Sequence, residues 1–522
     1  MSEDRESGNV QKLNKTFSLY QIILIGATST IGTGVLFSTA GMTALAGPGA
    51  IIAWGIASAM FLCMALPQAE LTYTYPEAGG PTRFSIYSHG KVTNLFNGMS
   101  DLTGYIFIIA TEAFAVVEGV NYLWPIFIAP NGIPSETGAV LGLLLLLAFV
   151  PLNYFGARLL GHTMTTFGSF KQGIYVLLGI GILLLAFHPS NFSSFRGFLP
   201  FGGYPILLAI PLAMFAMGGT RVVSDFSEEV KDKNILPKVI ILTTLIEISV
   251  YILFSVAFVS GINWAKLGIV PGNWAALSSI SGNPFVLLAS DTNVLWILVV
   301  ALIAAILGPF ITGILYLGGG TRMLFSMGRS GTVSNSMTKI NGKYKIPSWA
   351  LLALAVIAGI LVFITAPIPS IYGVITDAVI GYYIGYLPQM AALSVTRKQG
   401  ISQYKMRGNT IFAALGFTFV GLIVYWSGWP SVPYSEIIII IGVIIFASYY
   451  RITDRFKNAI WLMIFFPFSV IMAHIGSNGA LNIIPFWLST IIVAVVMLGI
   501  FYPWAYYSGL EKPSSQSFSE VE

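Results

Sequence analysis

Long apolar runs dominate the chain, and short polar segments that carry most of the charge separate them. A helical run of roughly 20 apolar residues is long enough to cross the ~30 Å hydrocarbon core of a bilayer. The pattern predicts an all-α polytopic membrane protein with fourteen membrane-spanning helices. Their centres are expected near residues 30, 58, 112, 145, 175, 214, 250, 308, 356, 384, 418, 442, 466 and 493.

Composition and charge agree with this interpretation. Of the 522 residues, 56% are hydrophobic and only 9% are charged, which is far from the balance of soluble domains. All but four of the 26 lysines and arginines fall on one side of the predicted topology; Arg196 and Lys266 fall opposite, and Lys171 and Arg221 lie within spans. Because cytoplasmic loops carry the excess of basic residues, both termini are expected in the cytoplasm and the protein in the cell membrane. The positive net charge then follows from topology, and no nucleic-acid partner is needed to explain it.

Glycine clusters interrupt the first and the sixth predicted span, at Ile31-Gly32-Thr33-Gly34-Val35 and at Met217-Gly218-Gly219-Thr220. Lipid offers no hydrogen-bond partners, so backbone groups released at such a break must face packed protein or a polar cavity. Paired interruptions in two halves of a membrane protein indicate the binding site of a secondary transporter. The alternative is that the glycines only permit tight packing, since small residues are frequent where membrane helices meet.

The first break offers both signs of charge to one ligand. The half-helix that ends near Thr30 exposes carbonyl groups and the negative end of its dipole, which suits an ammonium group. The half-helix that begins near Gly34 exposes N–H groups, which suit a carboxylate without a basic side chain. The expected ligand is therefore a zwitterion. At the second break, Phe215 is either a lid over this ligand or an ordinary packing residue.

Four stretches resemble the amino acid-polyamine-organocation superfamily, and especially its prokaryotic amino-acid permeases close to the cationic amino-acid transporter branch. They are the first break; Glu70-Leu71 with Pro76-Glu77-Ala78-Gly79-Gly80; Phe215 to Gly219 with Glu228-Glu229-Val230-Lys231 and Pro237; and Arg322 to Gly331. The stretches follow the family's order along most of residues 20–400. The chain departs from the family at Thr33, where the family has serine, and at Arg221, where many relatives have glutamate.

The resemblance implies a division of the chain. A cytoplasmic tail of residues 1–18 would precede a transport core of residues 19–400, in which ten helices form two inverted five-helix repeats with helices one and six discontinuous. Four accessory spans over residues 401–510 and a disordered cytoplasmic tail of residues 511–522 would follow. In such a fold, a bundle that contains both broken helices rocks against the rest and gives alternating access.

The resemblance also assigns roles at the breaks. Backbone N–H groups of the first break would bind the substrate carboxylate, carbonyl groups near the two breaks would hold its amino group, and Phe215 would act as the gate. The implied substrate-binding set is Thr30, Ile31, Gly32, Thr33, Gly34, Phe215, Ala216, Gly218 and Gly219.

Lys171 lies in an otherwise apolar span, where an unpaired charge is costly. The cationic amino-acid transporter branch carries a fifth-helix lysine at this place, 18 residues after Asn153, and its ammonium group occupies the position of a sodium ion in other relatives. The resemblance therefore implies transport without sodium coupling. Lys171 is either a fixed cation that holds helices one, five and eight together or a group that exchanges a proton during transport, and we prefer the first.

Other charges within the spans allow two interpretations each. Arg221 and Asp225 are four residues apart, which places them on one helical face and predicts an ion pair; alternatively, Arg221 faces the pathway and disfavours cationic substrates. Glu112, Glu118 and Glu247 either serve the pathway or a proton relay, or pair locally with neighbouring helices, which we prefer.

The leading function is a secondary active transporter of amino acids that uses protons or exchange. Transport of a related organic amine or polyamine is an alternative, as is a receptor or channel on the same fold. A membrane-embedded enzyme is disfavoured because no set of His, Asp, Cys or Ser has catalytic spacing, and neither a cofactor nor a metal is expected. The small residues Gly218, Gly219 and Thr220 leave room for a sizeable side chain, which mildly favours bulkier neutral substrates.

Overall fold

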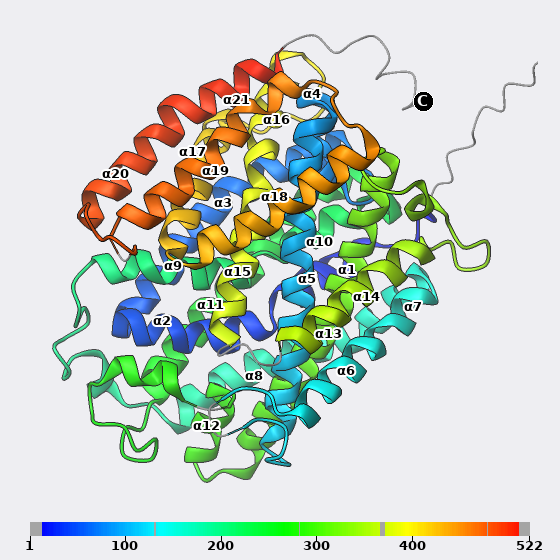
Figure 1. Ribbon diagram of the computed structural model, residues 1–522. Coiled ribbons are helices and arrows are strands. Elements are labelled where there is room, and N and C mark those ends of the chain that lie inside the picture. The colour runs from blue at the N-terminus through cyan, green and yellow to red at the C-terminus, as the bar shows by residue number, and fades with distance from the viewer. Residues whose placement is uncertain (1–12, 130–131, 281, 366–370, 478, 511–522) are drawn as a thin grey trace, which may run out of the picture.

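The computed structural model describes residues 13–129, 132–280, 282–365, 371–477 and 479–510, without the side chains of 364–365 and 371–374. These residues are almost wholly helical; they contain two isolated bridges, Phe17 with Val230 and Ile128 with Pro134, and no strand. Figure 1 shows the helices gathered into one bundle. The predicted all-α class is confirmed.

The helices between residues 19 and 400 are long and closely spaced. They are α1 (Leu19–Thr30), α2 (Thr39–Ala46), α3 (Ala50–Thr74), α4 (Gly80–His89), α5 (Lys91–Asn121), α6 (Glu136–Tyr154), α7 (Ala157–Thr163), α8 (Ser169–Leu185), α9 (Tyr204–Met217), α10 (Thr220–Asp225), α11 (Leu236–Gly261), α12 (Pro284–Asp291), α13 (Leu295–Arg329), α14 (Ser348–Thr365), α15 (Ile371–Ile384) and α16 (Tyr386–Lys398). The helices that follow are α17 (Asn409–Ser427), α18 (Ser431–Tyr450), α19 (Ile460–Ile475), α20 (Phe486–Val496) and α21 (Tyr502–Gly509).

Every predicted span centre lies in a helix. Among the described residues, 12 helical segments are long and apolar enough to cross a membrane. The first of them, Leu19–Thr74, holds the first two predicted centres, and a shorter apolar helix, Ser348–Phe363, holds the ninth. The inverted repeats and the division into a core and accessory helices stay predictions.

Two central helices organise the packing. The helix α5 lies against α13 and α15 along much of its length, and α1 packs against α10, α11 and α13. The later helices cover this group from outside, because α17 packs on α3 and α16 while α18 packs on α5 and α15. The residues of the first and second breaks, 30–35 and 215–220, are all buried by the surrounding helices.

The residues just before α1 belong to the packed structure. The Ser18 hydroxyl accepts from the backbone N–H of Gln21, and the side-chain oxygen of Gln21 accepts from the backbone N–H of Ser18, so the two residues form a capping box. The backbone N–H groups of Thr16 and Phe17 donate to the carbonyl of Glu229 at 2.8 and 2.9 Å. The predicted tail of residues 1–18 is thus anchored at its end. Residues 1–12 and the predicted disordered tail 511–522 lie outside the described residues.

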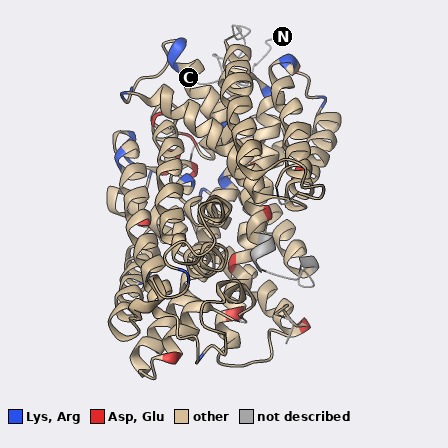
Figure 2. Cartoon of the chain, turned by 90° about the vertical axis from the view of Figure 1, so that its left-hand side faces the viewer, with Lys and Arg blue, Asp and Glu red and all other residues tan. Residues whose placement is uncertain are grey.

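Basic residues are distributed unevenly along the long axis. Figure 2 shows most lysines and arginines toward one end of the bundle, with few at the other. This is the asymmetry that the sequence predicts for a membrane protein with basic cytoplasmic loops.

Candidate functional site

The first predicted break is present. The helix α1 ends at Thr30, and Ile31 leaves helical geometry with φ −82° and ψ 95°. After Gly32 the chain returns to helix, first as a π-helical turn, Gly34–Ser38, and then as α2. Thr30, Ile31 and Thr33 are buried, so the interrupted backbone faces protein and not lipid. This satisfies the requirement that backbone groups freed within a membrane be sheltered.

The second break is milder. The helix α9 ends at Met217 and α10 begins at Thr220, yet Gly218 and Gly219 keep right-handed dihedral angles. The N–H groups of Arg221 and Val222 reach only three residues back, to the carbonyls of Gly218 and Gly219 at 3.2 and 2.9 Å. The chain therefore tightens at this point and does not unwind.

Carbonyl groups at the second break accept hydrogen bonds from side-chain hydroxyl groups. Tyr382 donates to the carbonyl of Gly218 at 2.7 Å, and Ser29 donates to that of Gly219 at 2.9 Å. The hydroxyl of Tyr251 lies 2.7 Å from the carbonyl oxygen of Ala216. The carbonyls of Gly218 and Gly219 therefore accept two hydrogen bonds each, one from the backbone and one from a side chain, which uses both lone pairs of each oxygen.

The two breaks lie against each other. A Cβ atom added to Gly34 would lie 2.6 Å from Cα of Ala216, which shows how closely the backbones approach. Tyr251 reaches both breaks, because its hydroxyl also lies 3.0 Å from the carbonyl oxygen of Thr30. Phe215 is buried in the last turn of α9, next to this contact. The structure thus gathers the predicted substrate-binding residues in one place.

Lys171 joins three helices. From α8, its Nζ donates to the carbonyls of Thr28 and Gly308 at 2.8 Å and to the hydroxyl of Thr312 at 2.7 Å. Thr28 belongs to α1, and Gly308 and Thr312 belong to α13. These are the contacts that a structural cation requires, since an ammonium group has three protons to donate.

Each break also has a carboxylate from a neighbouring helix. Glu112 on α5 accepts a hydrogen bond from the Thr33 hydroxyl at 2.6 Å. Glu247 on α11 accepts from the Thr220 hydroxyl at 2.6 Å. A Cβ atom added to Gly32 would meet the Thr312 hydroxyl and would lie 3.4 Å from Oε2 of Glu112. Thr312 thus lies beside Gly32 and accepts from Lys171, and Glu112 lies near the same glycine.

The predicted ion pair between Arg221 and Asp225 is wrong. Arg221 forms its ion pair with Asp101 on α5, and Asp225 instead accepts a hydrogen bond from Tyr105. The helix α10 spans only Thr220–Asp225, and both side chains find their partners on α5 and not on α10 itself. The guanidinium also lies over the Tyr382 ring, 5.0 Å from its centroid, and is fully buried. Arg221 is thus a link between helices in this conformation.

Sequence reasoning missed several residues that shape the site. Tyr251, Tyr382 and Asp101 are buried and contact the broken segments, but each lies on a helix far along the chain. The sequence indicates only that a tyrosine hydroxyl or a carboxylate buried within an apolar span needs a hydrogen-bond or ion-pair partner. Which partner it takes depends on helix rotation, which the sequence does not reveal.

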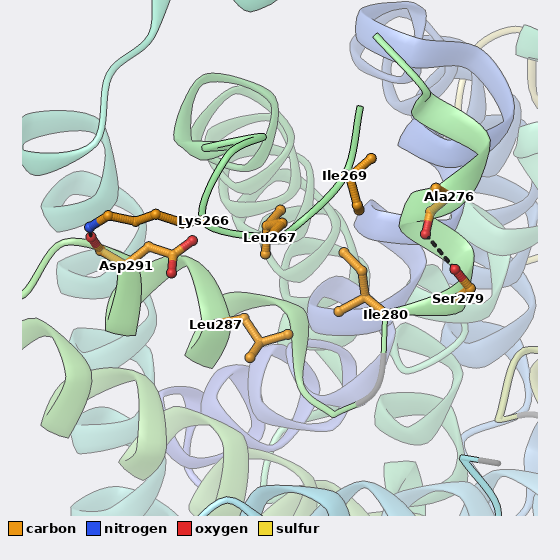
Figure 3. Close-up of a pocket in the computed structure, with 8 residues that line it drawn as sticks. All are labelled: Lys266, Leu267, Ile269, Ala276, Ser279, Ile280, Leu287 and Asp291. Atoms are coloured by element: carbon orange, nitrogen blue, oxygen red, sulfur yellow. Dashed lines mark hydrogen bonds between the residues drawn. The ribbon is translucent and has the colours of Figure 1, made fainter. Parts of the chain in front are cut away.

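A separate pocket lies among the connectors that follow α11. It has a volume of about 360 Å³ and is lined by residues between Lys266 and Asp291. Figure 3 shows Lys266 and Asp291 at one side of it and Ile269, Ile280 and Ser279 at the other. It contains none of the residues predicted to bind substrate.

Comparison with known proteins agrees with this architecture. The profile of the family described as "Amino acid permease" matches residues 17–441. A glutamate/serine transporter, AimA, of Bacillus subtilis is 26% identical, with 98% of this chain and 97% of the relative covered. An aspartate-proton symporter of the same organism is 29% identical, with 97% and 98% covered, and the branched-chain amino acid permease BcaP is 24% identical, with 84% and 94% covered. The chain therefore belongs to the amino acid permease family of the amino acid-polyamine-organocation superfamily, and it is a multi-pass membrane protein that transports amino acids.

Proposed function

We propose that the protein is a proton-coupled symporter that carries amino acids across the plasma membrane, with its termini in the cytoplasm. The substrate would bind where the breaks meet, with its carboxylate at the amides of Gly32–Gly34 and its ammonium group at the carbonyls of Thr30 and Ala216. Dipole ends and free lone pairs at these positions favour the two charges.

The observation that carries the proposal is the contact between Glu112 and Thr33. Glu112 accepts from the Thr33 hydroxyl, so its carboxylate occupies a donor of the first break that the substrate carboxylate could otherwise use. Protonating Glu112 removes its negative charge and weakens its hold on this donor. Binding of a proton and binding of the substrate would therefore assist one another, which is the thermodynamic condition for symport.

Lys171 supports proton coupling over sodium coupling. Its ammonium group lies among three oxygen atoms at 2.7–2.8 Å, on helices α1 and α13. A cluster of three oxygen atoms is suited to bind a cation, and here the ammonium group of Lys171 occupies that cation position. A free sodium ion would have to compete with it.

The proposed substrates have small neutral or acidic side chains. The two relatives matched along nearly the whole chain are named for glutamate, serine and aspartate. The packing at the second break also argues against the expected room for bulky side chains, because a Cβ atom added to Gly218 would lie 3.0 Å from the Tyr382 ring and 3.4 Å from the Tyr316 hydroxyl.

Uptake into proteoliposomes tests the proposal. Radiolabelled aspartate, glutamate, serine, leucine and putrescine would be offered with and without an inward proton gradient, in sodium or potassium buffer. We expect saturable uptake of the first three, stimulation by the gradient, and no effect of sodium. Saturable uptake that depends on sodium, or on amino acid inside and not on the gradient, would refute proton symport. Putrescine uptake would favour an amine transporter, and non-saturable flux would favour a channel.

A further inference from the structure

A groove of about 970 Å³ runs along the surface between α6 and α14. Its lining is mostly aliphatic and aromatic; Leu143 and Phe363 line one end, and Tyr154 and Trp349 line the other. Leu143 and Tyr154 lie on one helix, which at 1.5 Å per residue makes the groove roughly 16 Å long. That is about half of the ~30 Å hydrocarbon core. The groove therefore matches the depth of one leaflet.

Aromatic residues and a basic loop mark the end of the groove at the membrane surface. Tyr344 packs against Tyr154 and Phe155, with ring centroids 5.6 and 5.4 Å away. Lys343 and Lys345 flank Tyr344 and are exposed, and so is Arg158 at the start of α7. We call Arg158, Lys343 and Lys345 the basic mouth. Tyrosine and tryptophan favour the interface between lipid and water, which places this mouth at the level of the headgroups.

The basic mouth lacks the acidic neighbours found elsewhere on this side of the bundle. Other arginines there are in ion pairs: Arg83 with Glu77, Arg329 with Glu228, and Arg397 with Glu70. Within the described part of the chain, the basic mouth has no such pair. Residues 137–163 and 329–363, which form the groove and its mouth, contain no Asp or Glu. The mouth is therefore electrostatically complementary to an anion.

We propose that this groove binds one anionic phospholipid of the inner leaflet, with an acyl chain between α6 and α14 and the phosphate at the basic mouth. Basic pockets between membrane helices on the cytoplasmic side recognise lipid headgroups, and the apolar groove holds the chain. Both helices pack on α5 and α13, which carry Glu112 and Thr312. A bound lipid would thus stabilise the packing of α6 and α14 against α5 and α13, the helices that contact the first break.

Native mass spectrometry of the purified full-length protein tests this. The protein would be equilibrated with equal amounts of phosphatidylglycerol and phosphatidylcholine that have identical acyl chains. We expect one phosphatidylglycerol to be retained. Leu147→Trp, which fills the groove, and the triple variant R158Q/K343Q/K345Q should each lower this retention at least tenfold. The matched controls are Leu144→Trp, exposed on α6 outside the groove lining, and K398Q/K405Q/R407Q, three exposed basic residues.

Three results would overturn the proposal. The first is equal retention of the two lipids by the wild type, and the second is an equal loss in the controls and the test variants. The third is a dimer that Leu147→Trp dissociates while phosphatidylglycerol is not retained, because a second copy of the chain would then cover the groove. If Leu147→Trp does not fold, the triple variant decides, provided that its melting temperature without added lipid equals that of the wild type.

Discussion

Replacing Glu112 with glutamine is the sharpest test of the proposed coupling. Glutamine keeps the shape of the side chain and can still accept from the Thr33 hydroxyl, which lies 2.6 Å from the carboxylate, but it carries no charge at any pH. The variant therefore resembles the protonated, substrate-accepting state. It should bind substrate with an affinity that no longer depends on pH.

The size of the effect follows from the geometry at the first break. A Cβ atom added to Gly32 would lie 3.4 Å from Oε2 of Glu112, so a carboxylate bound at this backbone lies close to the ionised side chain. Two like charges about 5 Å apart repel by about 3 kcal/mol at an effective dielectric constant of ~20. Since each 1.4 kcal/mol is a factor of ten, protonation of Glu112 should change substrate affinity by roughly 100-fold.

The assay has two parts, binding and transport. Substrate binding in detergent, followed by scintillation proximity, should weaken in the wild type as pH rises through the range in which Glu112 ionises. Binding to Glu112→Gln should stay strong throughout. In proteoliposomes, the variant should exchange labelled for unlabelled substrate but should not accumulate it in response to a proton gradient.

Glu118→Gln is the matched control, because Glu118 lies on the same helix but away from Thr33. It should retain the pH dependence of the wild type. A pH profile of binding that is the same in Glu112→Gln as in the wild type would refute the competition for Thr33. Equal loss of gradient-driven uptake in both variants would show that uptake needs both carboxylates, whether or not they contact Thr33. The specific role of Glu112 would then be abandoned.

Three further outcomes are expected. Lys171→Met should abolish uptake, because it removes the donor that joins α1, α8 and α13; uptake at the wild-type rate would contradict this. Gly34→Ala should abolish uptake and destabilise the fold by about 1–3 kcal/mol, because its Cβ would lie 2.6 Å from the backbone of Ala216, whereas Gly173→Ala, which has open space, should change neither. Burial lowers the pKa of His89 to about 4, below its ordinary value near 6.5. As the pH falls, the unfolded state therefore takes up the proton before the folded state does. The free energy of unfolding should decrease by about 3 kcal/mol between pH 6.5 and 4. His89→Gln should flatten this decline in thermal unfolding measurements, and an unchanged slope would assign the decline to other groups.

The sequence predicts the parts of the site that depend on local chemistry. Gly32 and Gly34 mark the first break because glycine is a weak helix former, and a break within an apolar run exposes backbone groups that must be sheltered from lipid. The same logic identified Lys171, since a lone charge in an apolar span is costly without a partner. The second break was only partly predictable. At Gly218 and Gly219 the backbone hydrogen bonds reach three residues back and not four, but the dihedral angles of both residues stay helical.

Partners that come from distant helices could not be predicted. The four-residue spacing of Arg221 and Asp225 suggested a pair, but Asp101 on α5 takes the arginine and Tyr105 takes the aspartate. Spacing on one helix describes which side chains share a face, whereas the identity of the helix opposite that face is a property of the whole fold. Tyr251, which contacts both breaks, was missed for the same reason.

The ion pairs around α10 bear on the alternating access that is expected of this fold. Arg221 binds Asp101, and just beyond α10 the guanidinium of Arg322 binds both carboxylate oxygens of Glu229, at 2.5 and 2.9 Å. All four side chains are buried, so each pair has lost its hydration, and this loss offsets much of the attraction between the charges. When water enters on this side, the separated charges regain hydration as the pairs break. A state in which these pairs are broken and hydrated can therefore differ from this one by little free energy, which a transporter needs if binding of substrate and proton is to decide between two states.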